Sequence, residues 1–414
     1  MPSHGKGMLL TPLRFRRTYL SRALIILAVF FAVSGLVASV AVPGPREEPG
    51  QPGSQSGRIL DPTNTVTTLD REHGAGRFPS VAIGSDGLGL ISYFDETKAD
   101  LKVAHCLDIS CTAADLTTLD NMDAVGWYTS LAIGSDGLGL ISYGDATNDD
   151  LKVAHCVDVP CSEATTTTID VTGGSFTSIA IGSDGLALIS FMDANNMKLM
   201  VAHCLNVACT GAVVARIDNA GYVGGYVSLA IGSDGLGLIS YFGGSNGHLM
   251  VVHCLDTACS GATVATVDGG SYTGHWTSIT IGSDGFALVS YMDMPDGGIK
   301  VAHCLDLECT EAELTTLGST LGEYSSITIG PAGLGLIAVR DGANMSLKVA
   351  YCSNAACSEA VLATVDDAGH VGAYPSIAVG SDGFGLVAYY DETNNNLKVA
   401  HLGNPSSAHP SAIP

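Results

Sequence analysis

A unit of about 50 residues recurs seven times along this chain and limits the architectures that it can adopt. The phrase SVAIGSDGLGLISYFD begins at Ser80, and close variants follow at intervals of 48 or 50 residues. The seven copies begin at Ser80, Ser130, Ser178, Ser228, Ser278, Ser326 and Ser376. A period near 50 is too long for a β-helix coil and fits one four-stranded blade of a β-propeller. The repeat therefore predicts an all-β fold with seven blades.

Each unit divides into four strand-like segments. In the first unit they are Phe78–Gly84, Leu88–Phe94, Leu101–Cys106 and Asp115–Asp120. The first two are joined by Ser-Asp-Gly, which is a strong hairpin signal because Gly accepts a positive φ angle. Apolar residues often occupy both faces of a segment, as expected where a blade is covered by two neighbours. We expect blades of four antiparallel strands.

The two ends of the repeat array predict how the ring closes. The last unit has only three strand-like segments, which end with Leu397–His401. An unmatched segment, Thr65–Asp70, precedes the first unit and resembles the fourth segments of other units. An N-terminal strand that completes the C-terminal blade closes a propeller and removes its open edges. We therefore expect the seven-bladed propeller to span residues 65–402.

The first 42 residues differ in composition from the repeats. Five basic residues precede an apolar run from Ala23 to Val42, which is typical of a signal peptide. The run is also nearly long enough to span a bilayer, so an uncleaved N-terminal anchor is the alternative. Residues 43–64 and 403–414 are expected to form a Pro/Gly/Ser-rich linker and a flexible tail. The protein is then secreted, or anchored to the outer side of the cytoplasmic membrane.

The charge of the chain argues against two classes of partner. The formal net charge is −23, whereas binding to nucleic acid or to an anionic membrane needs a basic patch. We expect no nucleic-acid partner, membrane contact only through the N-terminal segment, and a monomer.

All 12 cysteines occur in Cys-x4-Cys pairs around the turn between the third and fourth strands. Facing residues of a hairpin lie within disulfide reach, and an exported chain favours disulfides. The expected pairs are Cys106–Cys111, Cys156–Cys161, Cys204–Cys209, Cys254–Cys259, Cys304–Cys309 and Cys352–Cys357. The alternative is zinc, because a histidine precedes the first cysteine in five pairs. We expect these histidines, and His401 in the last unit, to pack between blades.

Strand direction sorts the loops onto two faces of the ring. The Ser-Asp-Gly turns and the cysteine turns share one face, here called the disulfide face, which is nearly identical in every unit. The loops between second and third strands, and between units, lie on the opposite or variable face. Loops that vary in sequence and length are typical of binding sites, so a ligand is expected there.

Aromatic residues mark the variable face, because one stands at the start of the inner strand in every unit. Seven aromatic rings around a channel mouth can stack on sugar rings, or can plug the channel by apolar packing. The candidate ligand-binding residues are Phe78, Tyr128, Phe176, Tyr226, Trp276, Tyr324 and Tyr374, together with His275 and His370, which interrupt the repeat.

An acidic residue ends the second strand in six of the seven units. The loops that follow are rich in oxygen-bearing side chains, so Asp95, Asp145 and Asp391 are candidate calcium ligands. The alternative is that these aspartates cap the turn through Asx hydrogen bonds. No other cofactor is expected.

The unit SIAxGSDGxGLxSYxDxxNxxLKVAHC resembles repeats of exported bacterial β-propeller proteins of uncharacterised activity. The resemblance covers about Thr65 to His401 and implies the fold but no activity. The Ser-Asp-Gly-Leu-Gly turn is faintly similar to the Asp-box hairpin of sialidase-type propellers, from which it differs in its spacing and in lacking Trp.

Two functional hypotheses follow. The first is an extracellular binding or scaffold propeller that recognises a protein or glycan through its variable face, with no catalysis. The second is a carbohydrate-active enzyme, a sialidase-like glycoside hydrolase or a lyase, with its site at the channel mouth. Arg340 and Glu323 break the repeat in the sixth unit and are its candidate catalytic residues, although the pair equally fits a salt bridge. A paired-carboxylate motif is not visible, and a purely structural surface module is a third reading.

Overall fold

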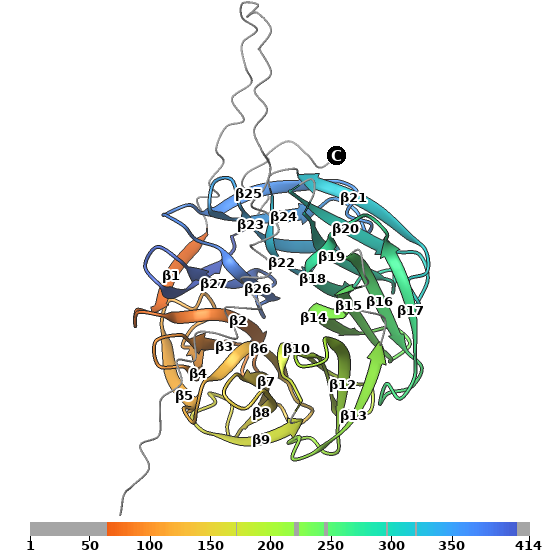
Figure 1. Ribbon diagram of the computed structural model, residues 1–414. Coiled ribbons are helices and arrows are strands. Elements are labelled where there is room, and N and C mark those ends of the chain that lie inside the picture. The colour runs from red at the N-terminus through yellow and green to blue at the C-terminus, as the bar shows by residue number, and fades with distance from the viewer. Residues whose placement is uncertain are drawn as a thin grey trace, which may run out of the picture. The chain divides into compact units, whose positions relative to one another are not determined.

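The computed structural model shows a ring of seven four-stranded antiparallel sheets (Figure 1). It describes residues 64–403 except 171, 219–222, 244–246, 295–296 and 319–320. The predicted signal or anchor segment, nearly all of the linker and residues 404–414 lie outside the described residues. Within the described part of the chain, no helix is long and apolar enough to cross a membrane. The predicted seven-bladed propeller is confirmed.

Six blades follow chain order from the axis outward (Figure 1). Blade 1 contains β2 (Ala75–Ile83), β3 (Gly89–Asp95), β4 (Asp100–Cys106) and β5 (Ala114–Asp120). Blade 2 contains β6 (Val125–Ile133), β7 (Gly139–Asp145), β8 (Asp150–Cys156) and β9 (Ala164–Asp170). Blade 3 contains β10 (Ser175–Ile181), β11 (Ala187–Asp193), β12 (Lys198–Cys204) and β13 (Ala212–Asp218).

The next three blades repeat this order. Blade 4 contains β14 (Val223–Ile231), β15 (Gly237–Gly243), β16 (His248–Cys254) and β17 (Ala262–Asp268). Blade 5 contains β18 (Thr273–Ile281), β19 (Ala287–Asp293), β20 (Gly298–Cys304) and β21 (Ala312–Gly318). Blade 6 contains β22 (Leu321–Ile329), β23 (Gly335–Asp341), β24 (Ser346–Cys352) and β25 (Ala360–Asp366).

Blade 7 joins the two ends of the propeller. It consists of β26 (Ala373–Val379), β27 (Gly385–Asp391), β28 (Asn396–His401) and, on the outside, β1 (Thr65–Asp70). The antiparallel register of β1 on β28 begins with Thr65 opposite His401. The predicted closure by an N-terminal strand is confirmed, and it gives blade 7 the same four strands as the others.

Each blade is buried from both sides by its neighbours. All seven residues of β3 and of β7 are buried, including their alternate positions. Leu90 of blade 1 and Ile141 of blade 2 belong to one apolar cluster, which shows that the core lies between blades. This packing explains why the second strands read as unbroken apolar runs rather than as alternating patterns.

One hydrogen bond repeats between all neighbouring inner strands. The Leu131 N–H donates to the Ser80 hydroxyl at 3.0 Å, which ties blade 2 to blade 1. The last bond of the series joins the Val81 N–H to the Ser376 hydroxyl at 3.1 Å, across a separation of 295 residues. The serine that opens each repeat is therefore a connector between blades. The seven donors are Val81, Leu131, Ile179, Leu229, Ile279, Ile327 and Ile377.

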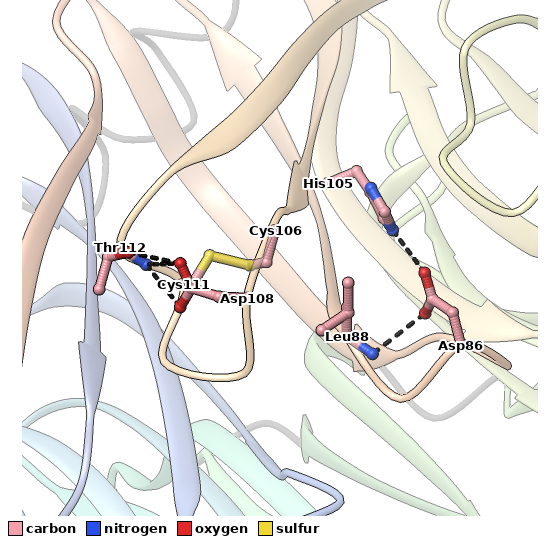
Figure 2. Close-up of a disulfide and its surroundings, with 7 residues drawn as sticks. All are labelled: Asp86, Leu88, His105, Cys106, Asp108, Cys111 and Thr112. Carbon is pink, nitrogen blue, oxygen red and sulfur yellow. Dashed lines mark hydrogen bonds and ion pairs between the residues drawn. A yellow bond between two sulfur atoms is a disulfide. The ribbon is translucent and has the colours of Figure 1, made fainter.

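Six disulfides hold the turns between third and fourth strands, as predicted. In blade 1, Cys106 and Cys111 are joined with their Cα atoms 4.8 Å apart (Figure 2). The other five predicted pairs are also formed, and no described cysteine is free. Inside the turn, Asp108 accepts hydrogen bonds from Thr112. The zinc alternative is wrong, because the sulfur atoms bond to each other.

The histidine before the first cysteine was expected to pack between blades. In the structure it also pairs with an aspartate of its own blade. His105 Nε2 lies 2.8 Å from Asp86 Oδ2, and the other oxygen of Asp86 accepts the Leu88 N–H (Figure 2). The pair joins the Ser-Asp-Gly turn to the third strand of the same blade. Five further pairs are His155–Asp136, His203–Asp184, His253–Asp234, His303–Asp284 and His401–Asp382. Blade 6 lacks both partners and has Ala332 and Tyr351 instead.

A buried polar cluster joins β1, the outermost strand of blade 7, to blade 1. Asp70 of β1 accepts hydrogen bonds from Tyr93 at 2.8 Å and from Lys102 at 2.6 Å, both in blade 1. Asp70 is 1% exposed and Lys102 is 5% exposed. Because a buried charge is stable only when paired, this cluster holds the N-terminal strand against the first blade as well as the last.

We predict that Asp70→Ala lowers the free energy of unfolding by about 3 kcal/mol, because it leaves buried Lys102 short of its main partner. Asp170→Ala is the matched control. Asp170 occupies the same position between blades 2 and 3, but Phe191 and Met200 stand where Tyr93 and Lys102 stand. Its loss is expected to cost about 1 kcal/mol or less. Denaturant unfolding measures both variants, and equal losses would contradict this role of Asp70.

Candidate functional site

A β-bulge in each innermost strand sets an aromatic residue apart from the regular ladder. In β2 the pairing with β3 shifts between Arg77 and Ser80, and Phe78 lies within the shift at a φ of 50°. All seven equivalent aromatics have φ between 46° and 55°. This left-handed region costs a non-glycine residue roughly 1–2 kcal/mol, and the second cysteine of all six disulfides shares it, so a positive φ recurs at two positions of the repeat.

The seven aromatic side chains form a closed ring, here called the aromatic ring. Each one contacts the aromatic residue of the next blade, with ring centroids 4.3–5.3 Å apart. Phe78 and Tyr374 complete the circle at 4.6 Å. The members, in order, are Phe78, Tyr128, Phe176, Tyr226, Trp276, Tyr324 and Tyr374. Sequence reasoning placed these residues around a channel, and the structure brings all of them together.

The aromatic ring lines a cavity of about 180 Å³. The remaining lining residues are those that follow each aromatic: Pro79, Thr129, Thr177, Val227, Thr277, Ser325 and Pro375. Their hydroxyl groups are engaged between blades; for example, Thr129 bonds to Ser92 and Thr277 donates to Ser240. Each aromatic residue is half-buried, so part of each remains accessible. The cavity is therefore mainly an aromatic surface.

Arg340 and Glu323 do meet, and a third residue joins them. Arg340 Nη1 lies 3.2 Å from Glu323 Oε2, while its Nη2 lies 2.5 Å from Glu392 Oε2 of blade 7. Arg340 is only 4% exposed, whereas both glutamates are about one-third exposed. Sequence reasoning missed Glu392, whose position holds glutamate in blades 1 (Glu96) and 7 but Ala146, Ala194 and Met294 in blades 2, 3 and 5.

A second ion pair continues this group into blade 1. Arg77 Nε lies 3.0 Å from Glu96, and the Arg77 guanidinium lies over the ring of Tyr390 at 5.4 Å. Burial raises the pKa of Tyr374, whose hydroxyl lies within the fields of Arg77, Arg340 and Glu392. These contacts define a charged arc beside the aromatic ring, made of Glu323, Arg340, Glu392, Arg77 and Glu96.

The two candidate histidines occupy different positions. His275 is 3% exposed and packs against Phe242 and Trp276, with ring centroids 4.1 and 5.9 Å away. It therefore packs against the aromatic ring, and its role in ligand binding stays a prediction. His370 is exposed in the loop between blades 6 and 7, where its N–H donates to Thr393.

The candidate calcium ligands act as turn caps. Asp95 Oδ1 accepts the N–H groups of Thr97 and Lys98, and Asp145 Oδ1 accepts those of Thr147 and Asn148. Asp391 makes the equivalent bond to Asn394. Among the residues that the structure describes, no group of three or more His, Cys, Asp or Glu side chains is placed to hold a metal ion. The geometry is that of the Asx-turn alternative.

Comparisons with known proteins support the fold and leave the family open. No protein-family model matches this chain, and no curated protein matches it. Hydrazine synthase from Kuenenia stuttgartiensis has a similar structure, with a TM-score of 0.52 and 14% identity, over 86% of this chain and 99% of that one. The α-L-arabinofuranosidase Arb93A from Fusarium graminearum has a TM-score of 0.49 and 12% identity, over 82% and 98% of the two chains. The sialidase NanB from Streptococcus pneumoniae has a TM-score of 0.46 and 10% identity, over 80% and 68%. At 14% identity and a TM-score above 0.5, the similarity to hydrazine synthase shows a shared fold alone.

We predict that His275 makes stability depend on pH. Burial lowers the pKa of His275 to about 4 in the folded protein, whereas the unfolded value is 6.5. Because the unfolded chain binds the proton more readily, stability falls as the pH drops from about 6.5 to about 4, by up to about 3 kcal/mol. His275→Phe removes this contribution. Chemical unfolding of both proteins at pH 7 and pH 4 measures it, and an identical pH dependence would refute it.

Proposed function

We propose that this protein is an extracellular, non-catalytic binding propeller that captures a protein or glycan ligand at the mouth of its axial cavity. The observation that carries the proposal is the aromatic ring, because all seven blades hold an aromatic side chain in a strained conformation around one cavity.

The chemistry of the cavity supports binding rather than turnover. Its lining side chains are aromatic, aliphatic or hydroxyl-bearing, and none is a carboxylate, histidine or cysteine. The titratable groups of this lining are its four tyrosines, whereas general acid–base catalysis most often uses a histidine or a carboxylate within hydrogen-bond reach of the substrate. Aromatic surfaces in a concave site instead supply affinity, while a few polar groups at the rim orient the ligand.

A specific observation favours the second candidate, a carbohydrate-active enzyme. An oxygen of Glu323 and an oxygen of Glu392 both lie 3.2 Å from Nη1 of Arg340, so they cannot be further apart than twice that distance. Glycoside hydrolases use two carboxyl groups about 5–10 Å apart. The charged arc is therefore the place where an activity would be sought.

The binding function predicts that Trp276→Ala and Tyr128→Ala each weaken capture of ligands at least about tenfold while the protein stays folded. The loss follows from removing aromatic contact area that a bound ligand covers. Capture is measured on glycan and cell-surface protein arrays, and folding is checked by circular dichroism. Tyr272→Ala is the control, because Tyr272 is an exposed aromatic in the loop that precedes β18 and is not part of the cavity lining.

Equal capture by all three variants and the native protein would contradict this function. Turnover of a polysaccharide by the native protein, lost in Arg340→Ala and in Glu392→Gln, would replace it with the enzymatic candidate.

A further inference from the structure

We propose that the disulfide turn of blade 5 is a docking site for a segment of a partner protein that carries basic and apolar side chains. The turn joins the two outer strands of its blade on the disulfide face, so this site is separate from the axial cavity of the proposed function. The residues of the site, here called the blade 5 rim, are Leu305, Leu307, Glu308, Glu311 and Glu313.

The blade 5 rim exposes apolar side chains. Leu305 is 47% exposed and Leu307 is 39% exposed. In blade 4 the side chain of Leu255, which corresponds to Leu305, lies 3.6 Å from the point where a Cβ atom at Gly261 would be. Blade 5 has Glu311 at the position of Gly261. The equivalence therefore places an apolar and an acidic side chain next to each other in blade 5.

The three glutamates of the rim are all exposed, and two of them share a face with Leu305. The Leu305 N–H donates to the Glu311 carbonyl, and His303 lies opposite Glu313 in the ladder between β20 and β21. Because alternate residues of a strand point to the same side, Leu305, Glu311 and Glu313 lie on one side of the hairpin. Glu308 lies in the turn itself.

Basic side chains do not compensate these carboxylates. Within the described part of the chain, none of the three glutamates forms an ion pair through its side chain. All described lysines and arginines lie in loops of the variable face or in the strand halves next to it. In blade 5, Lys300 pairs with Asp268 and Asp293 instead. A basic partner therefore relieves the repulsion between like charges at this rim.

Covalent and hydrogen bonds restrain the backbone of the rim. The disulfide between Cys304 and Cys309 closes the turn. Asp306 accepts hydrogen bonds from the Thr310 N–H, the Thr310 hydroxyl and the Glu311 N–H. A restrained surface loses little conformational entropy when a partner binds to it.

The charge of the rim distinguishes a basic protein segment from other occupants. A second copy of this chain brings the same acidic face, and the surface of an anionic membrane repels carboxylates. Apolar side chains rimmed by polar ones mark interaction sites. Opposite charges on the partner then orient it and speed its association.

Blade 4 offers the same turn without the acidic side chains and serves as an internal control. Its leucine, Leu255, is 59% exposed. The positions of the three glutamates are taken by Ala258, Gly261 and Thr263.

The probe for this site is a fluorescently labelled amphipathic peptide of leucine and lysine. Titration with the protein, followed by fluorescence anisotropy, should give saturable binding that weakens as salt is added. A serine–lysine peptide of the same length and charge should bind at least about tenfold more weakly, because it lacks the apolar contacts.

A triple variant tests the carboxylates of the rim. Glu308→Gln, Glu311→Gln and Glu313→Gln together should weaken binding of the leucine–lysine peptide about tenfold, because three exposed ion pairs are lost. Circular dichroism checks that the protein stays folded.

The matched control removes the same charge from the disulfide face of other blades. Asp115→Asn, Glu163→Gln and Glu359→Gln are exposed positions in blades 1, 2 and 6. Together they should change the affinity less than about twofold, because distant exposed charges are screened by salt.

A pair of single variants tests the apolar part of the rim. Leu305→Ser should weaken binding of the leucine–lysine peptide several-fold. Leu255→Ser, the equivalent change in blade 4, should leave the binding unchanged.

Three results would overturn the inference. Equal losses in the two triple variants would show that the peptide responds only to the net charge of the chain. Equal binding of the two peptides would show that the leucines take no part. Binding to phosphatidylcholine vesicles instead of the peptide, lost in Leu305→Ser, would replace the protein partner with a lipid surface.

Discussion

The structure depends on closing the ring between its first and last blades. A blade buries both faces only when it has two neighbours, so an open array would expose two apolar faces. Three kinds of contact make the closure: the β1–β28 ladder, the Val81–Ser376 hydrogen bond and the buried Asp70 cluster. Ser381, whose hydroxyl donates to the Gly87 carbonyl, adds a fourth at the disulfide face. Closure also determines that seven bulges meet around one axis.

The contacts around the aromatic ring stabilise the strained backbone of its seven residues. Each bulge holds its aromatic residue at a positive φ, which costs roughly 1–2 kcal/mol. The surrounding ladders, disulfides and interblade serine bonds keep these conformations in place, so the binding that we propose would meet aromatic side chains that are already ordered. Preorganisation lowers the entropic cost of binding, because the side chains are already ordered. The disulfide face of the propeller carries the six disulfides and the pairs of the His105–Asp86 type.

Much of the fold could be predicted from the sequence because the pattern of one blade recurs seven times. The blade count, the unmatched strand Thr65–Asp70 and the disulfides all follow from position within the unit. The His–Asp pairs could also have been found, since Ala332 and Tyr351 replace both partners in the same blade. Contacts between blades were harder to predict from the sequence. Glu392 approaches Arg340 from the next unit, and the burial of His275 depends on Phe242 of the preceding blade. Neither relation is encoded in local spacing.

The most direct test of the central claim, that seven strained aromatics surround an open site on the axis, is a crystal structure of the propeller. We expect a cavity inside the ring, with all seven aromatic residues at positive φ around it. An axis filled by the aromatic side chains themselves, with no cavity there, would contradict the claim and would make the ring a plug.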